Sequence, residues 1–212
     1  DLESGRDVTV NDEKLVAASL VKLYIMLAVF DGIEHGTITD DANVDALLKQ
    51  MITVSSNEAA NGLLSRIGNG DGKAAIATVA ATAQRYGFTS SEELRTLTGM
   101  ASGNAVENWT STRDCGSFLS QVYAGTLVSK NASERMMQLL LGQTRRTKIP
   151  AGVPSGVKVA NKTGELAAVQ NDVAIVFGTH PYVLAVMSND ISSAVAPSQI
   201  TELSRAVWDA AQ

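Results

Sequence analysis

Ser19 and Lys22 are the first pair of side chains whose types and spacing suggest chemistry. They lie three positions apart in Ser19-Leu-Val-Lys22, so on a helix they share one face. A lysine on an otherwise apolar helix is desolvated, and desolvation favours its neutral amine. A neutral amine beside a hydroxyl is a general base next to a nucleophile, and the N–H groups of the first helical turn stabilise a developing oxyanion. The same spelling at Ser155 and Lys158 precedes a predicted strand and is interpreted as chance.

Two further motifs bring polar side chains to positions that can face a ligand. Ser55-Ser-Asn57 joins two predicted helices, where its side chains can project into a cleft; the alternative is an ordinary helix N-cap at Ser56 or Asn57. Lys162-Thr-Gly164 lies in a strand-like stretch and offers a cation, a hydroxyl and an open backbone edge. That combination suits a carboxylate-bearing ligand along the strand, and the alternative for Lys162 is a solvated lysine on an exposed edge.

Hydrophobic periodicity predicts the elements that must position these motifs. Residues 18–34 form a helix that is apolar on nearly every face, as in a helix buried in the middle of a domain. Further helices are predicted at 44–54, 57–67, 73–86, 112–124, 133–141 and 198–211, with a long loop over 88–109. Strands are predicted at 6–10, 157–160 within the strand-like stretch 157–166, 171–177 and 182–187.

This order of elements predicts an α+β fold: one antiparallel sheet flanked by helices, with an all-helical lobe. We expect a single domain over 1–212, in which 1–35 and 150–212 form the α/β part and 36–149 the helical lobe. The 212 residues, 45% of them hydrophobic, are enough to bury a sizeable core.

Charge and residue counts exclude several classes of partner. The net charge is −5 and no dense basic stretch occurs, so nucleic acid is not an expected partner. The single cysteine, Cys115, excludes an internal disulfide and a four-cysteine metal site, and is expected to be a small buried residue. His35 and His180 lie far apart, so neither a metal nor another cofactor is expected. The apolar run over 20–30 is too short to span a bilayer, and no signal peptide is visible.

Taken in order, the three motifs resemble those of the penicillin-recognising serine enzymes, and their flanks resemble class A β-lactamases in particular. The resemblance implies a β-lactamase/transpeptidase-like fold and an acyl-enzyme at Ser19. Lys22 would activate this nucleophile, and Ser55 would relay a proton to the leaving nitrogen. The remaining roles that the resemblance implies are substrate amide binding by Asn57, carboxylate binding by Lys162, Thr163 and Gly164, an oxyanion hole from the N–H groups of Ser19 and Glu165, and a structural role for Asp172.

The sequence departs from the class A pattern in three places. The Glu-x-x-Leu-Asn loop that supplies the deacylating base is absent. Glu92, Glu93 and Glu107 are its candidate substitutes, although a solvated surface glutamate is the favoured interpretation of each. Lys22 and Ser55 are closer in sequence than in typical class A enzymes, so one wall of the entrance is missing. No arginine precedes Ala151-Gly-Val-Pro154; Lys148, or else Arg145 or Arg146, is expected to supply the second carboxylate-binding cation.

These departures leave three functions open. The first is a β-lactamase-like hydrolase with slow deacylation, and the second is a D,D-carboxypeptidase or transpeptidase acting on peptidoglycan. The third is a penicillin-binding sensor domain that is acylated without turnover. The expected partner is therefore a small β-lactam or a peptidoglycan stem peptide, and the protein is expected to be an extracytoplasmic monomer of bacterial type.

Overall fold

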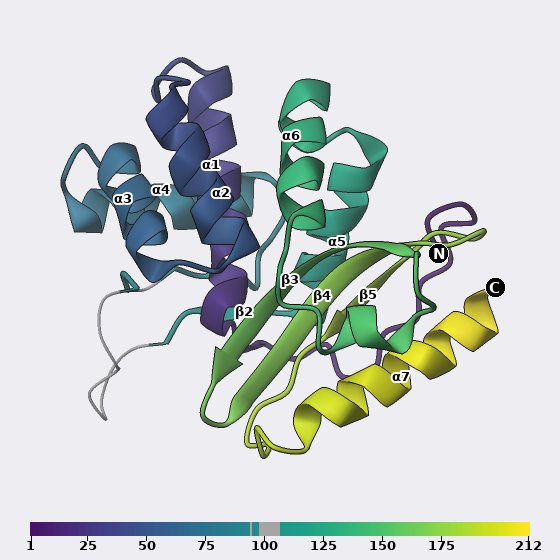
Figure 1. Ribbon diagram of the computed structural model, residues 1–212. Helices are drawn as coiled ribbons and strands as arrows, with labels where there is room; N and C mark the ends of the chain where they lie inside the picture. Colours follow the sequence, from purple (N-terminus) through teal and green to yellow (C-terminus); the bar gives the residue numbers. More distant parts are fainter. Residues whose placement is uncertain (94, 98–106) are drawn as a thin grey trace.

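The computed structural model describes residues 1–93, 95–97 and 107–212, and Figure 1 traces their path. This part of the chain contains a three-stranded antiparallel sheet in the order β3-β4-β5 and a separate pair, β1-β2. The strands are β1 (Leu15–Val16), β2 (Trp109–Thr110), β3 (Lys158–Leu166), β4 (Val169–Phe177) and β5 (Tyr182–Val186). The mixed architecture confirms the predicted α+β class, whereas the predicted domain bounds stay a prediction.

The helices follow the predicted periodicity closely. The long helix predicted at 18–34 begins as a 3₁₀ turn, η1 (Ala18–Val21), and continues as α1 (Lys22–Glu34), which is buried along most of its length. The other elements are α2 (Ala42–Thr53), α3 (Asn57–Ile67), α4 (Gly72–Arg85), α5 (Thr112–Ala124), α6 (Lys130–Leu141), η2 (Ile149–Gly152) and α7 (Ala196–Ala211). Side-chain N-caps begin several of them; the Ser111 hydroxyl, for example, accepts from the N–H of Asp114 at the start of α5.

The prediction of a strand at 6–10 is wrong. The residues there form no strand, and Val8 and Val10 are 76% and 80% exposed. Two alternating valines offer too little apolar surface to hold such a segment against a sheet. The first strand lies later, at Leu15–Val16, and it pairs with Trp109–Thr110 rather than with the main sheet.

The main sheet separates two apolar cores. On one face Ala160, Val173 and Ile175 join the core of α1 and the helices of the lobe. On the other face Val159 and Val176 pack with Ile200 of α7, which lies with η2 across the sheet from helices α1 to α6 in Figure 1. Because β4 is covered on both faces, it is buried at nearly every position. The edge strand β3 therefore runs along the boundary between the lobe and the sheet.

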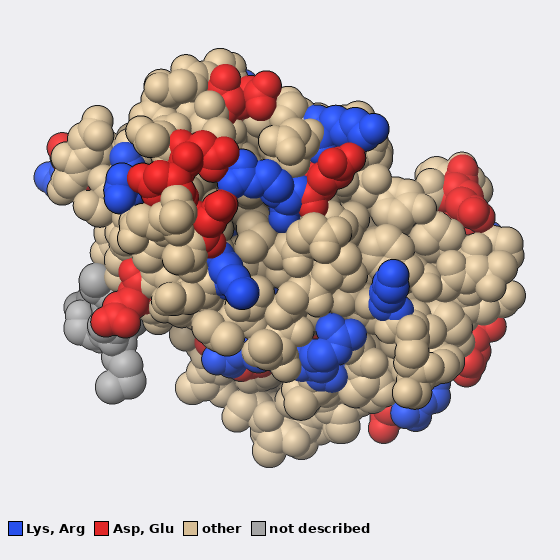
Figure 2. Space-filling view, turned by 45° about the horizontal axis from the view of Figure 1, so that its top comes forward, with Lys and Arg blue, Asp and Glu red and all other residues tan. Residues whose placement is uncertain are grey.

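Surface charge agrees with the composition. On the face shown in Figure 2, basic and acidic side chains are interspersed, without the broad basic surface of a nucleic-acid-binding face. Among the helices of the described residues, none is long and apolar enough to cross a membrane.

Candidate active site

Ser19 and Lys22 meet as the sequence predicts. Ser19 is in η1, just after Ala18, whose φ of 46° lies in the left-handed region and turns the chain sharply before the hydroxyl. The first residue of α1 is Lys22, whose Nζ lies 3.1 Å from Ser19 Oγ. Tertiary packing thus presents an amine and a hydroxyl to each other.

The Lys22 amine is fully buried and surrounded by acceptors. Besides Ser19, it contacts the Ser55 carbonyl at 2.6 Å, Ser55 Oγ at 3.1 Å and Asn57 Oδ1 at 2.7 Å. Burial, together with the nearby charge of Arg145, lowers the pKa of Lys22 to about 8, and the charge of Glu93 acts in the opposite sense. A substantial neutral fraction therefore exists near pH 8, as a general base requires.

Ser55 links the two lysines of the site. It lies between α2 and α3 at a φ of 62°, and its Oγ is 2.9 Å from Lys162 Nζ as well as 3.1 Å from Lys22 Nζ. Ser56, not Ser55, caps α3 by accepting from the N–H of Ala59. The N-cap interpretation thus holds for Ser56, which leaves Ser55 and Asn57 directed at Lys22.

Lys162 is fully buried on β3. Burial lowers its pKa well below the ordinary value, and the charges of Lys22 and Arg145 lower it further. It is therefore not the solvated edge lysine of the alternative interpretation. Thr163, whose carbonyl accepts from Lys162 Nζ at 2.8 Å, is 3% exposed.

Gly164 allows β3 to approach the nucleophile. A Cβ at this position would lie 2.7 Å from the Ala17 carbonyl and 3.2 Å from the Leu20 nitrogen, so a larger residue would push the strand from η1. From β4, the Asn171 amide donates to the carbonyls of Val16 and Ala17 at 3.0 and 3.3 Å. The sheet thus fixes the backbone beside Ser19.

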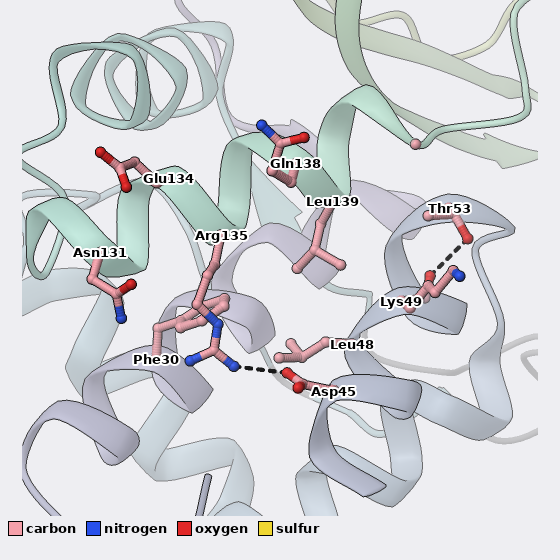
Figure 3. A pocket seen from close by; sticks show the side chains of 11 residues that line it. Phe30, Asp45, Leu48, Lys49, Thr53, Asn131, Glu134, Arg135, Gln138 and Leu139 are labelled. Carbon is pink, nitrogen blue, oxygen red and sulfur yellow. Dashed lines mark hydrogen bonds and ion pairs between the residues drawn. The ribbon is translucent and has the colours of Figure 1, made fainter. Parts of the chain in front are cut away.

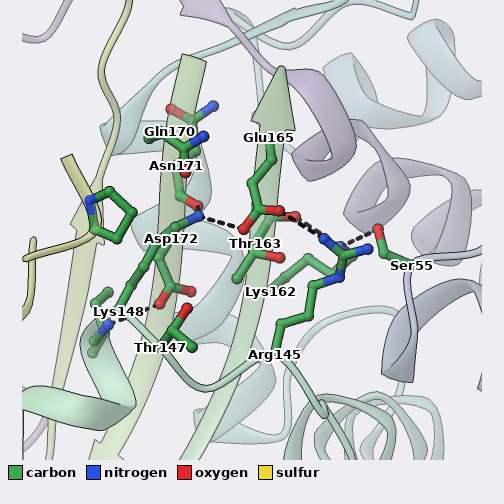
Figure 4. A network of polar contacts seen from close by, with 12 residues as sticks. Ser55, Arg145, Thr147, Lys148, Lys162, Thr163, Glu165, Gln170, Asn171 and Asp172 are labelled. Carbon is green, nitrogen blue, oxygen red and sulfur yellow. Dashed lines mark hydrogen bonds and ion pairs between the residues drawn. The ribbon is translucent and has the colours of Figure 1, made fainter. Parts of the chain in front are cut away.

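The structure places the expected second cation in an ion pair. Lys148, 1% exposed, donates to Glu165 Oε1 at 2.7 Å and to the Asn171 carbonyl at 3.2 Å. Arg145 Nη1 binds the other Glu165 oxygen at 2.6 Å (Figure 4), whereas Arg146 reaches the Val159 carbonyl. Partial burial raises the pKa of Glu165, but the hydrogen bonds and charges of Lys148 and Arg145 outweigh it and hold that pKa below its ordinary value.

Asp172 supports the site from behind. It is fully buried and accepts from Asn161 Nδ2 at 3.0 Å and from the Ile149 N–H at 2.9 Å. Burial raises its pKa to about 7. These contacts join β3, β4 and η2, in keeping with a structural role.

The three candidate glutamates differ sharply in environment. Glu92 forms an ion pair with Lys14, and Glu107 binds Arg95 at 3.0 Å. Glu93 is 2% exposed, and neither of its carboxyl oxygens has a hydrogen-bond partner in the described structure. Burial raises the pKa of Glu93 to about 8, against the opposing charges of Arg95 and Lys22. Nothing in the sequence distinguishes Glu93 from its neighbour, since its burial depends on how the loop folds back.

Two pockets are candidates for the ligand-binding site. The larger, about 600 Å³, lies between α1, α2 and α6 (Figure 3), where Arg135 stacks 4.9 Å from the Phe30 ring centroid and binds Asp40 and Asp45. Its lining offers no nucleophile beside a base. The smaller, about 90 Å³, is lined by Ser19, Asn57 and Glu165, among others, and we assign the site there. Within the described residues, no cluster of His, Cys, Asp and Glu could hold a metal ion.

Comparison with known proteins identifies the class. Residues 39–211 match the model of the beta-lactamase enzyme family, which is more than half of the chain, so the chain belongs to this family. The match includes Ser55 and Lys162 and begins after Ser19 and Lys22. A search of curated proteins gives no significant match.

Solved structures show the same fold along nearly the whole chain. A β-lactamase from Sphaerobacter thermophilus is 22% identical, with a TM-score of 0.86 over 98% of this chain and 88% of that one. An ancestral class A β-lactamase is 21% identical, with a TM-score of 0.84 over 99% and 91%. A mutant of PBP-A, described as an acyl-enzyme complex with penicillin G, is 24% identical, with a TM-score of 0.81 over 99% and 86%. At these identities the likeness establishes the fold.

Proposed function

We propose that the protein is a β-lactam hydrolase that acts through an acyl-enzyme at Ser19 and deacylates slowly. The observation that carries the proposal is the contact of the buried Lys22 amine with Ser19 Oγ at 3.1 Å and with Ser55 Oγ at 3.1 Å. A neutral amine there can accept the Ser19 proton as the hydroxyl attacks the β-lactam carbonyl. Membership of the beta-lactamase family makes this substrate class the first choice.

Acylation can then proceed along one line of polar groups. The Ser19 oxygen forms a bond to the carbonyl carbon, and the Ser19 proton passes to Lys22. The C–N bond of the lactam breaks, and Ser55 gives its proton to the leaving nitrogen while Lys22 returns a proton to Ser55. Lys162, 2.9 Å from Ser55 Oγ, stabilises the hydroxyl while its proton moves. The N–H groups of Ser19 and Glu165 are the proposed donors to the carbonyl oxygen.

Slow deacylation follows from the state of the nearby acids. Hydrolysis of the acyl-ester needs a base that activates water. Glu93 is the proposed base because it is buried and unpaired in the described structure, but at a pKa of about 8 it is mostly protonated at neutral pH. Glu107 is held in an ion pair with Arg95 at 3.0 Å and is not free to orient a water. The acyl-enzyme is therefore expected to accumulate near pH 7.

The test is intact mass spectrometry of the protein mixed with benzylpenicillin and followed over time. An adduct of one penicillin that decays slowly with release of hydrolysed product is expected, and Ser19→Ala is expected to show no adduct while remaining folded. An adduct on the Ser19→Ala protein would move the nucleophile elsewhere. Rapid turnover without any accumulated adduct would contradict slow deacylation.

A D,D-peptidase is the second candidate, and the protonated Glu93 favours it because a peptidase does not need fast hydrolysis of a β-lactam ester. It uses the same acylation residues on a stem peptide, in a compartment outside the cytoplasm. Release of D-alanine from a peptide ending in D-Ala-D-Ala, lost in Ser19→Ala, would select this function. A permanent penicillin adduct without peptidase activity would select a sensor.

A further inference from the structure

Glu165 lies between two cations at the edge of the candidate site. Each carboxylate oxygen binds one of them, Lys148 at 2.7 Å and Arg145 at 2.6 Å, and Figure 4 shows the three side chains together over β3 and β4. Charge-assisted hydrogen bonds of this kind are roughly twice as strong as neutral ones. The Glu165 carboxylate therefore binds both cations at once, one through each oxygen.

The same residue borders the space in which a substrate would sit. Glu165 and Ser19 line one small hollow, and Glu165 is two positions after Thr163 on the same edge strand. Arg145 is close enough to lower the pKa of both Lys22 and Lys162. The ion pair thus lies where an acidic group next to the scissile bond would seek a cation.

The other cations of this region already have partners. Lys22 and Lys162 both contact Ser55 Oγ, and Arg95 binds Glu107. Arg145, whose side chain is 47% exposed, is more accessible to an incoming anion than the buried Lys22 and Lys162, and Glu165 already binds it.

We propose that Glu165 is a specificity-determining residue: its side chain occupies Arg145 and Lys148, the cations expected to bind a substrate carboxylate besides Lys162, so the site loses part of its preference for substrates with a carboxylate beside the scissile bond over uncharged ones. This inference rests on the proposed acylation of Ser19. A substrate carboxylate must displace Glu165 from Arg145 or lie next to a like charge. The apparent affinity for such a substrate is its intrinsic affinity multiplied by the fraction of protein molecules in which Arg145 is free of Glu165.

The experiment compares one cephalosporin as its free acid and as its methyl ester, by single-turnover acylation. In Glu165→Gln the acid-to-ester ratio of acylation efficiency should rise about tenfold or more, because a charged hydrogen bond becomes available to the acid. The ratio should fall back in Glu165→Gln combined with Arg145→Gln. Glu134→Gln, which removes an exposed charge on α6, controls for net charge and should leave the ratio unchanged. An unchanged or lower ratio in Glu165→Gln would overturn the proposal.

A binding measurement separates this inference from the proposed function. Benzoate, which carries a carboxylate and no acylating bond, is titrated while the Arg145 Nε–H signal is followed by NMR. The Kd should fall about tenfold or more in Glu165→Gln, and an equal Kd would refute the screening by Glu165. Absence of acylation on both cephalosporins, with the benzoate effect intact, would refute the proposed function alone. If Glu165→Gln unfolds, Glu165→Asp replaces it. The aspartate keeps a negative charge for Lys148 but is too short to reach Arg145 as well, so the acid-to-ester ratio should rise by less than in Glu165→Gln.

Discussion

At the scale of single residues, Lys22 carries the most specific chemical consequence. Its pKa of about 8 means that its base form grows as pH rises through that value. The acylation rate should therefore climb from pH 6 through a midpoint near pH 8 and level off only at higher pH. Single-turnover acylation with a chromogenic cephalosporin across this range measures the profile.

The Lys22→Ala variant should lower the acylation rate by about 10²–10⁴-fold, the usual contribution of a general base. Lys158→Ala is the matched control, because Ser155 and Lys158 repeat the spelling of the motif and Lys158 is exposed at the start of β3. Equal rates in the two variants would remove Lys22 from the mechanism.

Glu93 gives a second prediction at this scale. The unfolded carboxyl ionises near 4.5 whereas the folded one keeps its proton to about pH 8, so the folded state binds more protons and its stability falls as pH rises between these values. Glu93→Gln should reduce this pH-dependent loss in the free energy of unfolding by roughly 2–5 kcal/mol. The upper value corresponds to the full pKa shift of Glu93. Urea unfolding at pH 5 and pH 8 measures it, with Glu92→Gln as the control, since the Glu92 side chain is 35% exposed and already ion-paired with Lys14.

The same variant tests the proposed base. In the wild-type protein, decay of the penicillin adduct should quicken as pH passes 8 and Glu93 ionises. Glu93→Gln should slow this decay about 10²-fold or more and abolish the pH effect. Decay that keeps its speed and pH profile in the variant would assign deacylation to another group.

Sequence reasoning reached the motif residues and the local contact of Ser19 with Lys22, but not the long-range pairings around the site. Ser19, Lys22 and Ser55 could be proposed because short-range spacing and a buried helix identify them. The ion pairs of Glu165 with Lys148 and Arg145 join residues about twenty positions apart in the sequence. Hydrophobic periodicity is a local pattern and cannot predict them. The burial of Glu93 likewise depends on tertiary packing of a loop.

At the scale of elements, the contact of β3 with η1 determines whether the site is assembled. Gly164→Ala places a methyl group against the Ala17 carbonyl, a backbone atom that has no rotamer to relieve the contact. We expect a loss of about 1–3 kcal/mol in the free energy of unfolding and slower acylation, because overpacking shifts the strand from Ser19. Urea unfolding and acylation rates measure both; Gly116→Ala, where a Cβ meets nothing within 4 Å, is the control.

Element prediction succeeded where one pattern dominated the segment. The amphipathic repeats of α3 and α5 gave their bounds directly, and β4 was recognisable from the apolar run at 173–177, although the strand begins at Val169, two residues before the predicted start. It failed at 6–10, where a short alternation of valines has no partner strand. Strand pairing is a long-range property, so β1 and β2, of two residues each, carry almost no local signal.

At the scale of the whole molecule, the two cores make separable contributions. Gly152 of η2 lies against α7, where a Cβ would come within 2.5 Å of Ser204 Cβ and of the Thr201 carbonyl. Gly152→Ala should destabilise the protein by about 1–3 kcal/mol through the second core. Under conditions where the variant stays folded, the acylation pH profile should keep its midpoint near 8. A shifted midpoint, measured by the same single-turnover assay, would show that the second core also sets the electrostatics of Lys22.

Cys115 gives the chain a natural reporter of transient opening. It is fully buried on α5, with its sulfur 3.7 Å from the Tyr24 hydroxyl and 3.6 Å from Thr110 Oγ1, and burial raises its pKa to about 11. A thiol reagent attacks only exposed thiolate, so modification requires α1, β2 and α5 to separate. The rate of modification, divided by that of an unfolded peptide, therefore gives the equilibrium constant for exposing the interior of the helical lobe, and no thiol need be introduced to measure it.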